Sequence, residues 1–473
     1  MTPAEPGEAP RRFNSLAMPA LLAGVLWLCA SDDIGGLLFA FVPGVILLGS
    51  GVSLLLWPGA ARITQMMALG GVVGVVSAVP ELLFSGFGFA AVVGGLSLVA
   101  FFCAGRAALQ LASRPDSVPA APGDWKTAGK AAIDEALMGY FAGTAQVPAG
   151  ARANALCTRV ERLERLLETV PWADPRMFNA EPPPPDDARL EAVKAGGMDG
   201  RRLHFTSGYV PPVGMPDVPH WLEDRRNAQA SALVFRRPQA GRPWLIGIHG
   251  YRMGGDWLNT RMLPPRLMSA RFDYNLVLPV LPLHGPRTVG WRSGDHYLDG
   301  ALLDLVFAQA QALWDLRRTV AWIRAEDPAA RIGVMGFSLG GYNAALLAAY
   351  ADSLDFCVAG IPLAEPVALL WDALPQPLRS YFTGRGIEPA RINKVMKLVS
   401  PLALPPRLPR ERLAIFAGTA DRVVPPDQPI RLSRHWDVPV QWYAGGHLTF
   451  RGESVVLGSL RTVAAAAGWR DTP

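Results

Sequence analysis

The 473-residue sequence is poor in charge. Charged residues make up 18% of the chain and hydrophobic residues 50%, whereas an average soluble domain is roughly 25% charged. The net charge of +5 is spread thinly and includes no long run of Lys or Arg, although such runs are typical of proteins that bind nucleic acid. The composition argues against a nucleic-acid partner, and the mean hydropathy of +0.19 is high for a cytosolic enzyme.

Cysteine and histidine are scarce as well. The four cysteines lie far apart and show no Cys-x-x-Cys spacing, which excludes the usual zinc motifs and a disulfide framework. The seven histidines form no His-x-His or His-Glu-x-x-His pattern. The sequence therefore predicts neither a metal site nor a bound cofactor.

The shortage of charge is greatest in the first 114 residues, which hold five basic and five acidic residues. Four apolar stretches follow one another there, at residues 13–30, 34–57, 63–79 and 84–105. A helix needs about 20 apolar residues to cross roughly 30 Å of hydrocarbon. The second and fourth stretches reach that length, and the first and third are at the short end. We expect an N-terminal tail (1–12) and a four-helix transmembrane domain (13–114).

The few charges of this segment predict its orientation. The basic residues lie before the first stretch, between the second and third, or after the fourth: Arg11, Arg12, Arg62, Arg106 and Arg114. The other turns carry only the acids Asp32, Asp33 and Glu81. Because Lys and Arg favour the cytoplasmic side, we expect an integral multi-pass protein whose C-terminal region lies on that side. A signal peptide is the alternative for the first stretch, but the later stretches would still hold the chain in the membrane.

A connector follows at 115–200, where Pro, Ala and Gly become frequent. Residues 126–141 and 157–170 have helical patterns. A run of four prolines at 182–185 then indicates a stiff extended linker. We expect these helices to pack on the following domain, rather than to form a lid or an oligomerisation hairpin.

Residues 201–473 alternate strand-like and helix-like patterns. Short apolar runs typical of strands buried on both faces occur at 232–235, 243–249, 274–282, 331–336, 356–361 and 412–417. Helical patterns lie between several of them, for example at 301–324 and 342–351. Such alternation predicts an α/β fold with a parallel sheet flanked by helices.

A catalytic motif follows one of these runs. Gly336 and Gly340 flank Ser338 in a Gly-x-Ser-x-Gly pattern, after a predicted strand and before a predicted helix. A nucleophile on a sharp strand-to-helix turn needs small neighbours, and its hydroxyl then projects above the sheet. The N–H groups of the following helix favour negative charge nearby. We predict that Ser338 is a nucleophile.

A catalytic serine needs a base, and the base needs an acid to orient it. Asp421 lies in the loop after the run at 412–417, and His447 follows two glycines after an apolar stretch at 438–443. We predict Asp421 as the acid and His447 as the base. Glu365 is the alternative acid. His435 lies in a helical pattern and is expected to be structural.

Backbone N–H groups complete the predicted site. The run at 243–249 ends in His249 and Gly250, followed by Tyr251. The amides of Tyr251 and of Leu339, the residue after the serine, are the expected donors to an oxyanion. We expect His249 to brace the loop rather than to take part in catalysis.

On these motifs, residues 201–473 resemble the α/β-hydrolase superfamily, in which the triad also has the order Ser, Asp or Glu, His. The resemblance implies an eight-stranded, mostly parallel sheet and hydrolysis of esters, thioesters or amides. Residues 282–287 (PLHGPR) are similar to a loop of dienelactone-hydrolase-like and acyl-hydrolase branches. The insertion at 362–411 is expected to form a cap, whose apolar residues line an acyl pocket or form the cap's own core.

The leading interpretation is a membrane-anchored serine hydrolase that cleaves carboxylic esters, including lipid or long acyl esters. Two alternatives remain open. One is a peptidase or amidase of the same fold, and the other is a catalytically silent membrane scaffold. An intact order of serine, aspartate and histidine argues against the scaffold.

Overall fold

The computed structural model describes residues 14–29, 34–57, 59–144, 148, 150–237 and 241–469. The chain divides into two compact units. The helical unit comprises Met1–Thr144 together with two short segments from far along the chain, Gly418–Val423 and Ala444–Phe450. The sheet unit comprises Ala145–Ala417, Val424–Tyr443 and Arg451–Pro473.

The helical unit is built on helices packed through small residues. Its elements are η1 (Ser15–Ala17), α1 (Met18–Leu28), α2 (Ile34–Leu56), α3 (Ala61–Glu81), α4 (Gly86–Leu111), α5 (Trp125–Thr144) and η6 (His447–Thr449). A Cβ on Gly24 would lie 2.5 Å from the backbone of Leu48, so α1 and α2 approach closely. The indole of Trp27 donates to Ser97 at 3.0 Å and joins α1 to α4. Many large aliphatic side chains of α2–α4 are exposed, whereas most of the buried positions hold Ala, Gly or Ser, as expected for helices that face lipid.

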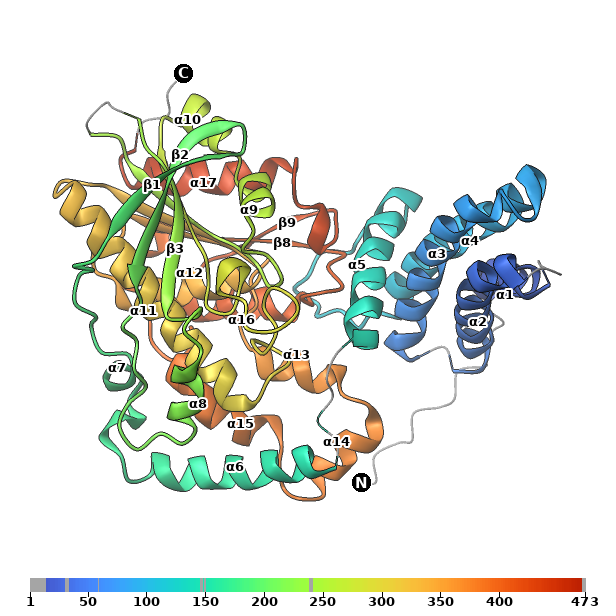
Figure 1. Cartoon of the computed structure of the whole chain (residues 1–473), viewed down its shortest axis with the longest axis horizontal. Helices are drawn as coiled ribbons and strands as arrows, with labels where there is room; N and C mark the ends of the chain where they lie inside the picture. The colour runs from blue at the N-terminus through green and yellow to red at the C-terminus, as the bar shows by residue number, and fades with distance from the viewer. Residues whose placement is uncertain are drawn as a thin grey trace. The chain divides into compact units, whose positions relative to one another are not determined.

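Among the described residues, three helices are long and apolar enough to span a membrane: α2, α3 and α4 (Figure 1). The first apolar stretch forms a shorter apolar helix, Ser15–Leu28, so a fourth crossing stays a prediction. Glu81 is the last residue of α3; it is buried and accepts a hydrogen bond from Ser85. Four residues used to predict the orientation lie outside the described residues: Arg11, Arg12, Asp32 and Asp33.

The sheet unit holds one nine-stranded sheet in the order β1-β2-β3-β5-β4-β6-β7-β8-β9. The strands are β1 (Arg189–Ala195), β2 (Met198–Thr206), β3 (Gln229–Phe235), β4 (Trp244–Ile248), β5 (Asn275–Pro279), β6 (Ile332–Phe337), β7 (Phe356–Gly360), β8 (Leu413–Gly418) and β9 (Val440–Tyr443). All six predicted apolar strands are confirmed. The sheet has one strand more than expected because Gly196 and Gly197 adopt positive φ and turn the chain back, so that β1 pairs with β2 as a hairpin.

The middle of the sheet is parallel, through the pairs of β4 with β5 and β6, of β6 with β7, and of β7 with β8. Strands β4 to β8 are buried along their whole length. Their unbroken Val, Ile, Leu and Phe runs are what a strand covered on both faces requires. Consequently the carboxyl ends of these strands open at one edge of the sheet, where the candidate residues follow.

Helices and 3-10 turns fill the rest of this unit. Its helices are α6 (Ala151–Leu167), α7 (Pro175–Phe178), α8 (Val218–Glu223), α9 (Asp256–Met262), α10 (Pro265–Arg271), α11 (Leu302–Glu326), α12 (Leu339–Tyr350), α13 (Pro366–Ala373), α14 (Gln376–Thr383), α15 (Pro389–Met396), α16 (Asp427–Trp436) and α17 (Ser454–Ala466). Helix α12 packs on β4, β6 and β7, and α17 packs on β7 and β9. Helix α6 packs on α15, where Glu164 forms ion pairs with Arg391 and Lys394.

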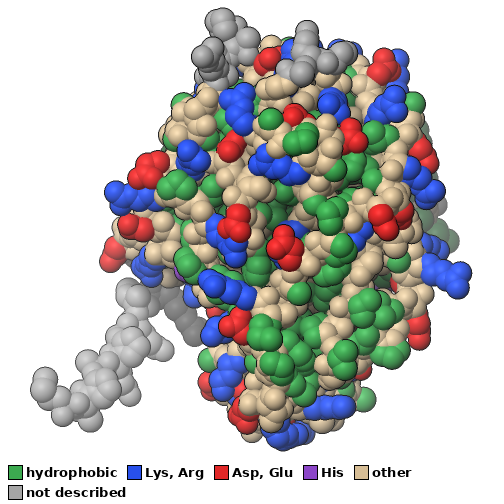
Figure 2. All heavy atoms as spheres, turned by 90° about the vertical axis from the view of Figure 1, so that its left-hand side faces the viewer, with side chains coloured by type: hydrophobic (Ala, Val, Ile, Leu, Met, Phe, Trp, Pro, Cys, Tyr) green, Lys and Arg blue, Asp and Glu red, His purple; other side chains and the backbone are tan. Residues whose placement is uncertain are grey.

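The surface of the molecule mixes charges of both signs. Figure 2 shows a face on which Lys and Arg side chains alternate with Asp and Glu, with hydrophobic side chains between them. Exposed ion pairs such as Arg236–Glu326 belong to this pattern. Pairs of this kind contribute less than about 1 kcal/mol each, so the fold depends on its buried contacts.

Candidate active site

Ser338 lies on a strained turn between β6 and α12. Its backbone has φ 58° and ψ −116°, a conformation that costs a residue with a side chain on the order of 1–3 kcal/mol. The turn is held by hydrogen bonds from the Ser338 amide to the carbonyl of Gly360 (2.9 Å) and from the Leu363 amide to the Ser338 carbonyl (3.3 Å). Ser338 is half-buried, whereas the residues on both sides are buried. This is the geometry of a nucleophile elbow.

The two glycines of the motif are required because backbone atoms lie too close to them for a side chain. A Cβ on Gly336 would lie 1.9 Å from the carbonyl oxygen of Gly340, and one on Gly340 would lie 2.1 Å from that of Ile248. Any side chain at either position would force the turn open. The motif also brings the loop after β4 against the serine, because a Cβ on Gly250 would stand 3.6 Å from Cβ of Ser338.

His249 and Tyr251 follow β4 in that loop. His249 is fully buried and its Nε2 accepts the amide of Leu281 at 3.1 Å. Burial lowers the pKa of His249 to about 4, so the ring is neutral and acts as a brace between two loops. Tyr251 packs against the ring of His284 and under the guanidinium of Arg252, and this packing fixes the backbone that carries the Tyr251 amide.

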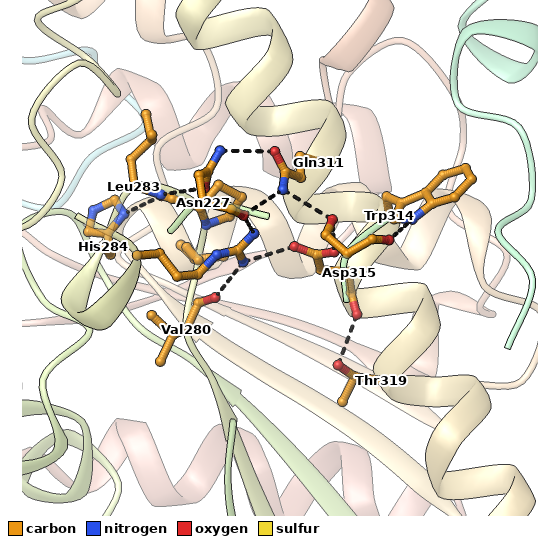
Figure 3. Close-up of polar contacts among 12 residues, drawn as sticks. Asn227, Val280, Leu283, His284, Gln311, Trp314, Asp315 and Thr319 are labelled. Atoms are coloured by element: carbon orange, nitrogen blue, oxygen red, sulfur yellow. Dashed lines mark hydrogen bonds and ion pairs between the residues drawn. The ribbon is translucent and has the colours of Figure 1, made fainter. Parts of the chain in front are cut away.

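The loop after β5, which includes the block at 282–287, is anchored by a buried polar network (Figure 3). Arg287 is 1% exposed and forms an ion pair with Asp315 of α11 at 2.8 Å. Its guanidinium also donates to the carbonyls of Val280 and Asn227. Gln311 joins the same network through Asn227. In this chain Arg287 of the block therefore has a structural role: it supports the loop against which His249 rests.

Asp421 and His447 form a hydrogen-bonded pair in the helical unit. Nδ1 of His447 lies 2.7 Å from Oδ2 of Asp421, and the two residues are 4% and 2% exposed. The Val423 amide donates to the other carboxylate oxygen at 3.0 Å. Burial alone would lower the pKa of His447, but the charge and hydrogen bond of Asp421 together with the charge of Asp134 outweigh burial, and the pKa is raised. An imidazole oriented in this way is suited to act as a base through Nε2.

The alternative residues have other partners. Glu365 forms an ion pair with Arg431 at 2.7 Å, and Nε2 of His435 lies 2.8 Å from the carbonyl of Leu404. In the segment predicted as a cap, α13 and α15 border a cavity of about 370 Å³ whose lining includes Tyr342 and Glu365. Among the described residues, no group of three or more His, Cys, Asp and Glu side chains is arranged to hold a metal ion.

One residue of the site was missed from the sequence. Asp134 of α5 accepts hydrogen bonds from the backbone amides of His447 (2.5 Å), Leu448 (3.1 Å) and Arg422 (3.1 Å). The sequence of residues 126–141 predicts only a helix that packs on the following domain. An acid in the middle of an apolar helical stripe was the available signal, because a buried carboxylate requires partners.

The chain is similar to known proteins over most of its length. It is 32% identical over 378 residues to the uncharacterized protein Rv2627c of Mycobacterium tuberculosis, a match that covers 77% of this chain and 88% of that protein. No protein-family model matches the chain.

Solved structures with a similar fold include acetyl xylan esterase 1 from Thermoanaerobacterium sp. JW/SL YS485, at 18% identity and a TM-score of 0.42, covering 68% of this chain and 96% of that one. An acylaminoacyl peptidase of Pyrococcus horikoshii has 16% identity and a TM-score of 0.37, covering 60% of this chain and 46% of that one. With its parallel sheet and the elbow after β6, the sheet unit has the α/β-hydrolase fold, and the chain belongs to the same family as the mycobacterial protein Rv2627c.

Proposed function

We propose that this protein is a membrane-anchored serine hydrolase that cleaves carboxylic esters. Ser338 is the nucleophile, His447 the general base and acid, and Asp421 the residue that orients His447. The amides of Tyr251 and Leu339 stabilise the oxyanion. The observation that carries the proposal is the backbone of Ser338, whose positive φ costs stability and is typical of a serine held for reaction.

The order of the strands supports the assignment of the base. Ser338 follows β6, Asp421 follows β8 and His447 follows β9, and these strands lie on the same side of β4 in one sheet. In a sheet of this kind the carboxyl ends of the strands carry the functional loops. The hydrogen bond of Asp421 to Nδ1 selects the tautomer whose Nε2 can take a proton.

The reaction then has two halves. Oγ of Ser338 attacks the acyl carbon while His447 takes the hydroxyl proton, and the negative charge develops on the former carbonyl oxygen. Collapse of this intermediate breaks the bond to the leaving alcohol, to which His447 returns the proton. Water repeats the sequence on the acyl-enzyme: it forms the bond to the acyl carbon, gives a proton to His447, and the carboxylic acid leaves as Ser338 regains that proton.

Helices α2, α3 and α4 serve as the anchor in this proposal. Arg62 is the second residue of α3 and Arg106 lies near the end of α4, whereas Glu81 ends α3. Whether or not α1 crosses the membrane, the predicted side of the C-terminal region is the same, because that side depends only on the crossings after Arg62. The positive-inside rule then assigns the catalytic residues to the cytoplasmic face. An enzyme held there meets esters with an apolar acyl or alcohol part.

Turnover of a substrate panel tests the proposal. Purified wild-type protein in detergent is given p-nitrophenyl esters of increasing acyl length and the matching aminoacyl anilides. We expect ester hydrolysis, at least a 10³-fold loss of turnover in Ser338→Ala, and full turnover in Ser454→Ala, a serine exposed at the start of α17. Turnover of anilides alone would identify a peptidase, and the absence of both activities in the wild type would contradict the proposal.

A further inference from the structure

Helix α5 carries two adjacent acidic side chains with no solvent exposure, Asp134 and Glu135. A buried carboxylate is costly unless its oxygens receive hydrogen bonds. Both residues have partners in the segments after β8 and β9. One of them, His447, lies 313 residues further along the chain than Asp134. The placement of these two acids therefore reflects a tertiary requirement of the helical unit.

Asp134 connects the loop of Asp421 to the loop of His447. Its Oδ2 accepts the amides of Arg422 and His447, and its Oδ1 accepts the amide of Leu448. Arg422 is the neighbour of Asp421 in the chain. A single carboxylate thus fixes the backbone at both members of the acid–base pair.

Gly446 makes this approach possible. A Cβ at this position would stand 2.5 Å from Oδ2 of Asp134 and 2.9 Å from the carbonyl oxygen of Lys130. The ammonium of Lys130 also donates to the carbonyl of Ala444 at 2.9 Å. The glycine before His447 is therefore needed for the close packing of this loop on α5.

Glu135 extends the connection to the membrane helices. One carboxylate oxygen accepts Nε of Arg422 at 2.8 Å, and the other accepts the hydroxyl of Thr64 in α3 at 2.8 Å. Helix α5 lies tightly on α4, since a Cβ on Gly105 would be 2.0 Å from the carbonyl oxygen of Ala128. A continuous set of contacts thus leads from α3 and α4 through α5 to the loops of Asp421 and His447.

We infer that Asp134 is a positioning residue for the acid–base pair, so that the N-terminal helical unit supplies part of the catalytic machinery as well as the anchor. The inference rests on the proposed function, since it assigns Asp134 to the same reaction. Asp134 touches neither the nucleophile nor a reacting atom in this role. It acts through the backbone of His447, and a displacement of about 1 Å at such a group costs on the order of 10²-fold in rate.

The charge of Asp134 adds an electrostatic effect that can be measured. The charged groups around it are Lys130 and Glu135 on its own helix and Asp421, Arg422 and His447 on the two loops. The negative charges of Asp421 and Asp134 both raise the pKa of His447. Removal of one of these charges therefore lowers the pKa at which His447 loses its proton.

The substitution Asp134→Asn tests the inference. An asparagine has only one acceptor oxygen, so it cannot accept all three amides and carries no charge. The matched control is Asp124→Asn, on the residue before the same helix, where the side chain accepts the Thr127 amide at 2.7 Å and asparagine is an equally good N-cap. Each variant is compared with the wild type in ester turnover, in the pH dependence of kcat/KM, and in amide hydrogen exchange of the peptide at 444–450.

In Asp134→Asn we expect kcat to fall by roughly 10- to 100-fold, with a KM within about twofold of wild type. The acid limb of the pH profile of kcat/KM should move to lower pH, and the amides of residues 444–450 should exchange faster. Asp124→Asn should match the wild type in all of these. The inference would be overturned if Asp134→Asn had the same kcat, the same acid limb of the pH profile and the same amide hydrogen exchange as wild type. If the wild type shows no turnover, the proposed function fails, and the exchange comparison still decides whether Asp134 holds the His447 loop.

Discussion

The proposed nucleophile and the proposed acid–base pair are held in place by different means. Ser338 is held within the sheet unit, by the two glycines, the strand and the helix that adjoin it in the chain and by backbone hydrogen bonds to Gly360 and Leu363. His447 and Asp421 are fixed by α5, which precedes them by almost the whole length of the sheet unit. The comparison teaches that the residues of a proposed site can be held by their neighbours in the chain in one case and by a distant helix in the other. Substitutions in the two parts should therefore have different effects.

The largest effect is expected from the base itself. His447→Ala removes the proton acceptor while the elbow stays intact, and we expect a loss of kcat of about 10³- to 10⁶-fold. Thermal unfolding checks that the sheet unit remains folded, and His435→Ala is the control because that ring contacts only a backbone carbonyl in the described contacts. If His447→Ala kept turnover within about tenfold of wild type, the assignment of His447 as the base would be contradicted.

The substitution Gly340→Ala tests the turn that holds Ser338. Its new Cβ would lie 2.1 Å from the carbonyl oxygen of Ile248, so the elbow must open, and we expect a stability loss of several kcal/mol together with loss of turnover. The control is Gly458→Ala in α17, where a Cβ meets nothing within 4 Å and alanine favours the helix by about 1 kcal/mol. Urea unfolding measures both. Equal unfolding midpoints would show that the turn tolerates a side chain.

The buried network of the sheet unit gives the next effect. Arg287→Met leaves Asp315 buried without its cation, and breaking a buried pair in this way costs about 3–5 kcal/mol. Arg236→Met, which breaks the exposed pair with Glu326, should cost less than about 1 kcal/mol. Urea unfolding followed by tryptophan fluorescence compares them, and similar losses in the two variants would contradict the structural role of Arg287.

The substitution Gly446→Ala tests the contact between the His447 loop and α5. The added methyl group would clash with Asp134 and push the His447 loop away from α5, so we expect about a 10-fold loss of kcat with little change in overall stability. In a double-mutant cycle with Asp134→Asn the two losses should be less than additive, because both act on one contact. Additive losses would mean that Gly446 acts elsewhere.

The smallest effect concerns stability and pH. Burial, and then the charge of Asp421, raise the pKa of Asp134 to about 7, above the value near 3.9 of an unfolded chain. The folded protein therefore binds this proton more tightly, and its contribution to stability is present below about pH 4 and is lost as the pH rises to about 7. Between pH 5 and 8 the free energy of unfolding of wild type should therefore fall relative to that of Asp134→Asn. If the free energies of unfolding of the two proteins changed equally over this pH range, the raised pKa of Asp134 would be contradicted.

The difference between the two halves also explains what the sequence could reveal. The elbow was predictable because its glycines, strand and helix are contiguous, and the parallel strands were predictable because each is an unbroken apolar run. The pairing of Asp421 with His447 could be proposed from chain order alone. Asp134 could not be assigned, because its partners are backbone amides, which carry no sequence signal and are brought to α5 only by the tertiary fold.

Two further features depended on geometry that a sequence pattern does not contain. The hairpin of β1 and β2 adds a ninth strand in a region that the prolines marked as a linker. The first apolar stretch forms a helix of only 11 residues, because apolar composition sets an upper limit to a crossing and does not set where the helix begins. Arg287, by contrast, was noticed in its motif, but its buried ion pair became visible only in the structure.

The most direct test of the central claim is the site of covalent labelling. Wild-type protein is treated with a fluorophosphonate and digested, and the modified peptide is identified by mass spectrometry. We predict a single adduct on Ser338, formed much more slowly in His447→Ala and Asp134→Asn than in wild type and at an unchanged rate in Asp124→Asn. An adduct on another residue, or labelling of Ser338 at the same rate in all four proteins, would contradict the account.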